Sequence, residues 1–151
     1  MISKYEIISN SVACISRDIQ RLERMEMAKY HLKAPHAQCL LALSRYPDGL
    51  IATALCELCE KDKAAISRTV AELEEHGLVR RLERNGTHYR AALVLTAAGW
   101  DAATAVSRKA QQAVELAGEG LTDADREIFY RVLAQIAENL HTICKAGLKD
   151  V

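Results

Sequence analysis

The sequence contains few residues that break secondary structure, and few aromatics. Its 151 residues include 7 glycines, 2 prolines, 1 tryptophan and 1 phenylalanine, and aromatics make up 5%. This argues against a β-sandwich, a β-barrel or a collagen-like chain, and the apolar remainder favours helices. No apolar run approaches the ~18 residues of a membrane span. Because the first six residues hold no apolar signal core, we expect a cytoplasmic protein with no membrane partner.

The sequence also lacks the motifs of common enzymes and the cysteine pattern of a secreted protein. There is no P-loop, GxSxG, HExxH or dinucleotide fingerprint, so we expect neither an enzyme nor a cofactor. The five cysteines are an odd number, which does not suggest a disulfide framework. Cys56 and Cys59 have CxxC spacing but lie within an expected helix, and His36 and Cys39 are the only further ligand candidates nearby. We therefore expect core cysteines and no metal.

Net charge is zero, but the charges are sorted along the chain. Residues 61–90 hold seven basic and five acidic side chains. Three of the acids, Glu72, Glu74 and Glu75, sit together between two basic stretches. Two basic edges therefore flank an acidic patch.

Apolar residues recur at helical spacing along most of the chain. Helices are expected over residues 5–29, from Pro35 to a turn at 46–49, over 53–60, 63–76 and 97–117, and from 123 onward. Pro35 is expected at the first helical position, and Leu55 and Leu58 are expected to point inward. The first helix carries one apolar seam, made of Ile8, Val12, Ile15, Ile19 and Leu22. A long helix at a chain end has little to pack on within its own domain, which favours a partner subunit.

The apolar period changes after Gly77. A strand is expected over residues 78–84, Asn85-Gly86 is a strong hairpin signal, and a second strand returns over 89–95. Three helices followed by a hairpin is the order of a winged helix-turn-helix, whose second helix enters the major groove of DNA. The expected fold is therefore mainly α with a small β-hairpin wing, a winged helix-turn-helix with further helices at its N- and C-terminal sides.

The helix expected over residues 63–76 carries the candidate DNA contacts. Ile66, Val70 and Leu73 form its inward face. Its outward N-terminal part presents Lys63, Ala64, Ser67 and Arg68, with Ala65 and Thr69 at the flanks. Small and hydroxyl side chains allow close approach to base edges, and cations neutralise phosphates. A solvated helix face in any helical protein would look similar, so periodicity alone leaves DNA binding open.

Motifs along nearly the whole chain resemble those of the MarR family of bacterial transcriptional regulators. The resembling stretches are residues 36–43, Leu55-Cys56, residues 62–68 and 73–81, Leu95-Thr96-Ala97-Ala98-Gly99, and Leu121-Thr122 with the following helix. The resemblance implies a homodimeric, sequence-specific DNA-binding regulator, expected to be a repressor, on an imperfect palindrome. It also implies a small-molecule effector, often an anionic aromatic compound, between the dimerisation helices and the DNA-binding lobe.

The resemblance divides the chain into an N-terminal dimerisation helix (1–34), a winged helix-turn-helix lobe (35–96) and C-terminal dimerisation helices (97–151). The implied dimerisation residues are Ile8, Val12, Ile15, Ile19, Phe129, Leu133, Ile136 and Leu140. The wing departs from the family pattern Asp-x-Arg, because Thr87 and Tyr89 take these two positions and Arg90 comes one residue late. Candidate replacements for the wing contact are Arg84, His88 and Arg90.

Two alternatives remain open on the same scaffold. The neutral charge, the three acids and the atypical wing suit a winged-helix protein-interaction module without DNA binding. A thiol- or metal-responsive sensor would instead use Cys56 and Cys59 as its trigger. Cys14 lies beside the seam of the first helix, a place more typical of a small apolar residue.

Overall fold

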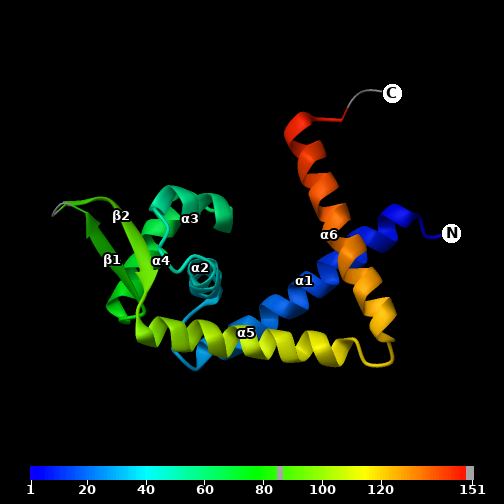
Figure 1. The fold of residues 1–151 in the computed structure, drawn as a ribbon, viewed down its shortest axis with the longest axis horizontal. Coiled ribbons are helices and arrows are strands. Elements are labelled where there is room, and N and C mark those ends of the chain that lie inside the picture. The colour runs from blue at the N-terminus through cyan, green and yellow to red at the C-terminus, as the bar shows by residue number, and fades with distance from the viewer. Residues whose placement is uncertain (85–86, 149–151) are drawn as a thin grey trace. The chain divides into compact units, whose positions relative to one another are not determined.

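The computed structural model describes residues 1–84 and 87–148, with the backbone alone at 84 and 87–90. In chain order the elements are α1 (Lys4–Ala28), α2 (Ala34–Ser44), α3 (Ala52–Cys59), α4 (Lys63–Glu75), β1 (Val79–Arg84), β2 (Thr87–Leu95), α5 (Ala97–Ala117) and α6 (Asp123–Ala146) (Figure 1). They fall into two compact units, Met1–Ala113 and Val114–Val151. The predicted mainly helical fold with one hairpin is confirmed.

Local sequence accounts for most helix ends. Ser3 and Glu6 form a capping box at the start of α1: the Glu6 N–H donates to Ser3 Oγ over 3.1 Å, and the Ser3 N–H donates to the Glu6 carboxylate over 2.7 Å. α2 begins one residue earlier than predicted, so Pro35 takes the second helical position instead of the first. That position also lies among the early N–H groups without a helical partner, so proline is tolerated there.

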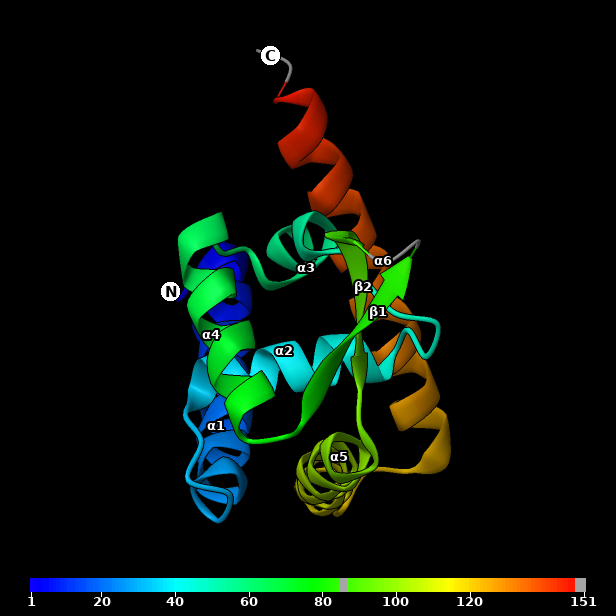
Figure 2. The ribbon, with the colours of Figure 1, turned by 90° about the vertical axis from the view of Figure 1, so that its left-hand side faces the viewer.

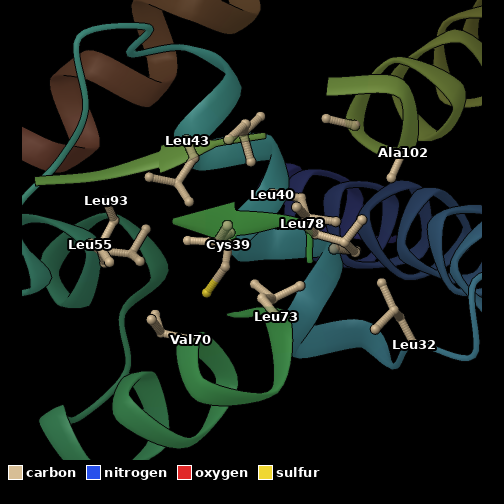
Figure 3. Close-up of a cluster of buried hydrophobic side chains, with 14 of the residues drawn as sticks. Leu32, Cys39, Leu40, Leu43, Leu55, Val70, Leu73, Leu78, Leu93 and Ala102 are labelled. Atoms are coloured by element: carbon tan, nitrogen blue, oxygen red, sulfur yellow. The ribbon is translucent and has the colours of Figure 1, made fainter. Parts of the chain in front are cut away.

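The core of the first unit lies between α2, α3, α4 and the hairpin. Leu40, Leu43, Leu55, Leu73 and Leu93 are all buried there (Figure 3). Full burial of a leucine side chain is worth about 1.5–3 kcal/mol. Figure 2 shows α2, α3 and α4 gathered beside the hairpin.

The prediction for Leu58 is wrong. Leu55 is buried, but Leu58 is 48% exposed. α3 packs against α2, α4 and β2, and the eight-residue helix turns Leu58 away from the buried core.

The wing is an antiparallel pair with one irregularity. Its register pairs Val79 with Leu95 and Leu82 with Ala92, and it shifts between Leu82 and Arg84. Leu50 adds an isolated bridge to Leu93, with reciprocal backbone hydrogen bonds of 3.1 and 2.8 Å. The segment before α3 is thereby fixed to the wing.

Thr96 joins the end of α4 to the start of α5. Its hydroxyl donates to the Gly77 carbonyl oxygen over 2.6 Å and accepts from the Gly99 N–H over 3.1 Å. Gly77 has φ +69°, the left-handed conformation that ends α4. Gly99 packs so closely on the Leu78 backbone that a Cβ atom there would lie 2.0 Å from the Leu78 carbonyl oxygen. The Leu-Thr-x-x-Gly stretch is therefore a structural joint.

The second unit contains α6, which begins as the sequence predicts. Thr122 and Asp125 form the capping box, with the Asp125 N–H donating to Thr122 Oγ1 over 3.1 Å. Arg126 donates to the Gly118 carbonyl oxygen over 2.6 Å and so fixes the turn that precedes the helix. Among residues 1–84 and 87–148, no helix is both long enough and apolar enough to cross a membrane.

Candidate nucleic-acid interface

The N-terminal half of α4 presents a continuous exposed face. Asp62 caps the helix by accepting from the Ala65 N–H over 2.7 Å. Lys63, Ala64, Ser67 and Arg68 are all exposed on this half, whereas Ile66, Val70 and Leu73 are buried against the core. Two cations, a hydroxyl and a small side chain therefore face solvent together, next to a helix N-terminus that favours anions.

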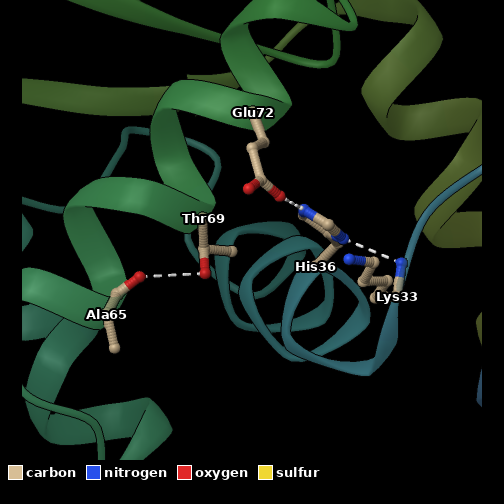
Figure 4. A network of polar contacts seen from close by, with 5 residues as sticks. All are labelled: Lys33, His36, Ala65, Thr69 and Glu72. Atoms are coloured by element: carbon tan, nitrogen blue, oxygen red, sulfur yellow. Dashed lines mark hydrogen bonds and ion pairs between the residues drawn. The ribbon is translucent and has the colours of Figure 1, made fainter.

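The flanking candidates lie differently. Ala65 is half-buried, and Thr69 is 8% exposed. The Thr69 hydroxyl donates to the Ala65 carbonyl oxygen over 3.0 Å, so a hydrogen bond within α4 already uses its proton (Figure 4). Arg84, His88 and Arg90 lie in the wing strands, outside the residues whose side chains the structure describes.

Two of the three acids on α4 are paired. The Arg81 guanidinium donates to the Glu74 carboxylate over 2.9 Å. Glu72 accepts a hydrogen bond of 2.5 Å from His36. Two acids of the patch between the basic edges therefore have partners within the fold. The patch lies on the C-terminal half of the helix. The exposed N-terminal half carries no acid between Lys63 and Arg68.

His36 connects α2 to α4, a role that the sequence did not reveal. Its side chain is buried, and its Nδ1 accepts from the Lys33 N–H over 2.8 Å (Figure 4). A backbone N–H can only donate, so the imidazole proton resides on Nε2, which donates to Glu72. The ring therefore caps the start of α2 and holds the middle of α4 at the same time. The only sign of this role in the sequence was the place of His36 at the third position of a helix.

We predict that His36→Ala destabilises the fold by about 2 kcal/mol, because it leaves the Lys33 N–H and the Glu72 carboxylate without their partner. Urea unfolding followed by circular dichroism measures the difference. Glu72→Gln is the matched variant, since an amide oxygen still accepts from Nε2, and it should lose less than half as much. Equal losses in the two variants would contradict the described network.

The predicted dimerisation side chains are largely exposed within one chain. On α1, Ile8, Val12 and Ile15 are 46%, 48% and 51% exposed, and Ile19 is half-buried. On α6, Phe129, Leu133 and Leu140 are exposed and Ile136 is half-buried. Each helix thus carries an apolar stripe that the chain itself leaves open to solvent.

The cysteines lie in the core and at its edge. Cys39 on α2 is buried, whereas Cys56 and Cys59 on α3 are half-buried and pack against the core. Both ring nitrogens of His36 are already hydrogen-bonded, one to Lys33 and the other to Glu72. Over the described part of the chain, no three His, Cys, Asp or Glu side chains gather as a metal site.

α2, α3 and α4 form a buried three-helix lobe, α4 presents an exposed face, and a hairpin wing follows. This arrangement defines a winged helix-turn-helix protein. Residues 31–91 match the model of the MarR family. This match agrees with the resemblance seen in the sequence.

Solved structures share the whole fold. A MarR family transcriptional regulator from Silicibacter pomeroyi is 22% identical with a TM-score of 0.75, and the match covers 91% of this chain and 92% of that one. A MarR transcriptional regulator from Methanosarcina mazei Go1 is 20% identical with a TM-score of 0.79, over 91% and 99% of the two chains. A Listeria monocytogenes protein, solved in complex with 26mer DNA, is 20% identical with a TM-score of 0.74, over 94% and 96%. No curated protein sequence matches the chain.

Proposed function

We propose that the protein is a homodimeric, sequence-specific DNA-binding transcriptional regulator of the MarR type. It acts in the cytoplasm as a repressor, and a small-molecule effector tunes its affinity for an imperfect palindrome. In this proposal residues 35–96 bind DNA, and residues 1–34 and 97–151 hold the two subunits together.

The exposed N-terminal half of α4 is the observation that carries the proposal. Lys63 and Arg68 are free of ion pairs with other described residues and suit phosphate contacts. Ser67 and Ala64 are small enough to allow base edges to approach. The Listeria protein with the same fold was solved bound to DNA, which supports this use of the face. Arg84, His88 and Arg90 are proposed as the wing contacts.

The apolar stripes of α1 and α6 support the dimer. Exposed apolar side chains that gather along one face of a helix mark interaction sites in soluble proteins. A two-fold dimer places two copies of α4 about 34 Å apart, one turn of the DNA helix.

A pocket beside α2 and α3 supports the proposal of a small-molecule effector. It measures about 240 Å³ and is lined by α1, α2 and α3, with Glu23, Arg45, Tyr46 and Leu58 among its walls. Arg45 offers a charge for a carboxylate, and Tyr46 and Leu58 offer surface for a ring. Glu23 belongs to the same wall, and burial raises its pKa. Leu58, which is turned away from the core, would contact the effector in this pocket.

The mutants Arg68→Ala and Ser67→Ala test the α4 face. Arg68→Ala should weaken binding to specific and scrambled duplexes alike, and should reduce the slope of log affinity against log salt by roughly one unit per phosphate contact in each subunit. Ser67→Ala should keep the slope and change the preference among sequences. Arg108→Ala, an exposed cation on α5, is the matched control and should change neither. Salt-insensitive binding, equal in all four proteins, would contradict the proposal and favour the protein-interaction module.

A further inference from the structure

A pocket of about 280 Å³ lies beside the exposed face of α4. Three cations from three separate segments line it. Lys33 is the residue before α2, Lys61 belongs to the loop between α3 and α4, and Arg68 lies on α4 itself. All three side chains are exposed. Positive charge from distant parts of the sequence therefore shares one pocket.

The charge of these three cations is not neutralised within the fold. None of them has an ion pair with another described residue. The one acid in the lining is Glu72, and its carboxylate accepts a hydrogen bond from His36. Asp62, the neighbour of the loop cation, caps α4 through the Ala65 N–H. The lining therefore keeps a net positive charge, which favours an anion.

The buried wall of the pocket offers few groups to a small anion that enters it. Both ring nitrogens of His36 and the hydroxyl proton of Thr69 already take part in hydrogen bonds within the fold (Figure 4). Cys39 and Ile66 are buried there, and Gln38 is half-buried and adds one amide. Among the described residues, no buried side-chain polar atom lacks a hydrogen-bond partner. The exposed cations thus suit a phosphate group that lies across the mouth of the pocket as part of a larger molecule.

Arg68 connects this pocket to the face of α4 that is proposed to read DNA. Its side chain lines the pocket and also belongs to the exposed face with Ala64 and Ser67. The major groove is about 12 Å wide, so a helix that enters it has a phosphate strand along each side. The pocket flanks α4, where one of these strands would run.

His36 fixes the backbone of Lys33 relative to α4. Its Nδ1 accepts from the Lys33 N–H over 2.8 Å, while its Nε2 donates to Glu72 on α4 (Figure 4). The start of α2 is therefore held in place before DNA binds, and less conformational freedom is lost on binding.

We propose that Lys33, Lys61 and Arg68 form a phosphate clamp, which holds the DNA strand that borders the groove entered by α4. The inference rests on the proposed function. It extends the DNA contacts beyond α4 and the wing to the start of α2 and to the loop between α3 and α4. Contacts to phosphate position a protein on the duplex but carry no sequence information, so the clamp acts on all duplexes alike.

Lys33→Gln and Lys61→Gln test the phosphate clamp in the full-length protein. Each should lower the slope of log affinity against log salt by roughly one unit per subunit. Each should also weaken specific and scrambled duplexes by the same factor, about fivefold to tenfold per subunit at 0.1 M salt. Lys109→Gln is the matched control, because it removes an exposed lysine from α5, and it should change neither quantity. Circular dichroism checks that each variant is folded.

A neutral methylphosphonate in place of single phosphates locates the contact. It is scanned along a duplex that the wild-type protein selects from random DNA. The wild type should lose affinity when the clamped phosphate of a half-site is neutral, and Lys33→Gln should be insensitive to that same replacement. Losses that simply add at every position would contradict a direct contact.

The outcomes separate the clamp from the proposed function. Salt-dependent binding that Arg68→Ala weakens, but Lys33→Gln and Lys61→Gln do not, would overturn the clamp and leave the proposed function standing. Inorganic phosphate that releases the duplex more strongly than chloride at equal ionic strength, an effect lost in Lys33→Gln, would overturn the assignment to a DNA strand and make the pocket a small-anion site. A wild-type protein without salt-dependent DNA binding would overturn both.

Discussion

Ile136→Asp is expected to convert a dimeric protein into monomers and to remove measurable DNA binding. Ile136 lies on the apolar stripe of α6, and Ile15 on that of α1 is 51% exposed within one chain. If a partner covers these stripes, a carboxylate there is desolvated without a counter-charge, which costs several kcal/mol per site. The two-fold symmetry places that cost twice in each dimer. Ile15→Asp should act in the same way.

Sedimentation velocity at micromolar concentration measures the effect. Gln135→Asp and Ser16→Asp are matched controls, because each adds the same charge at an exposed polar neighbour, and both should stay dimeric. Circular dichroism separates dissociation from unfolding. Wild-type protein that sediments as a monomer would remove the dimer from the proposal.

Gly99→Ala is expected to cause the largest loss of stability among single methyl additions. A Cβ atom at residue 99 would lie 2.0 Å from the Leu78 carbonyl oxygen, and Leu95 Cβ is a further neighbour at 3.3 Å. Backbone yields less than a flexible side chain, so α5 must move away from the wing, and the Gly99–Thr96 hydrogen bond must lengthen. We expect a loss of about 3 kcal/mol, the upper end of the overpacking range.

Gly77→Ala is the matched comparison for this prediction. It also adds one methyl group, but at a residue with open space around it and φ +69°. Only left-handed strain opposes the change, so the expected loss is about 1 kcal/mol. Chemical denaturation of both variants provides the measurement, and a Gly99→Ala loss no larger than that of Gly77→Ala would contradict the close contact.

Local signals explain why so much of the fold could be predicted. Asp62, Thr96 and Thr122 stand at helix starts, and each side chain accepts from a backbone N–H three residues later. Gly77 ends α4 in the left-handed conformation. These contacts join residues within three or four positions, so the pattern that specifies them can be read from a short window.

The missed features join residues that are far apart. The Leu50–Leu93 bridge is a single pair without periodicity, and His36 meets Glu72 across 36 positions. The CxxC spacing drew attention to Cys56 with Cys59, but the packing of α2 on α3 places Cys39 and Cys59 in the lining of one pocket. Such contacts depend on how helices pack, which no spacing in the sequence encodes.

Selection of bound duplexes from a randomised DNA library tests most directly whether two α4 helices read DNA as a pair. The reduced wild-type protein is incubated with the library, and the retained sequences are aligned. The account predicts an imperfect inverted repeat whose half-site centres lie about 10 base pairs apart, one turn of the duplex. It also predicts that Ser67→Ala selects a different half-site with the same spacing. No enrichment at moderate salt, or enrichment of a single unrepeated site by the wild type, would contradict it.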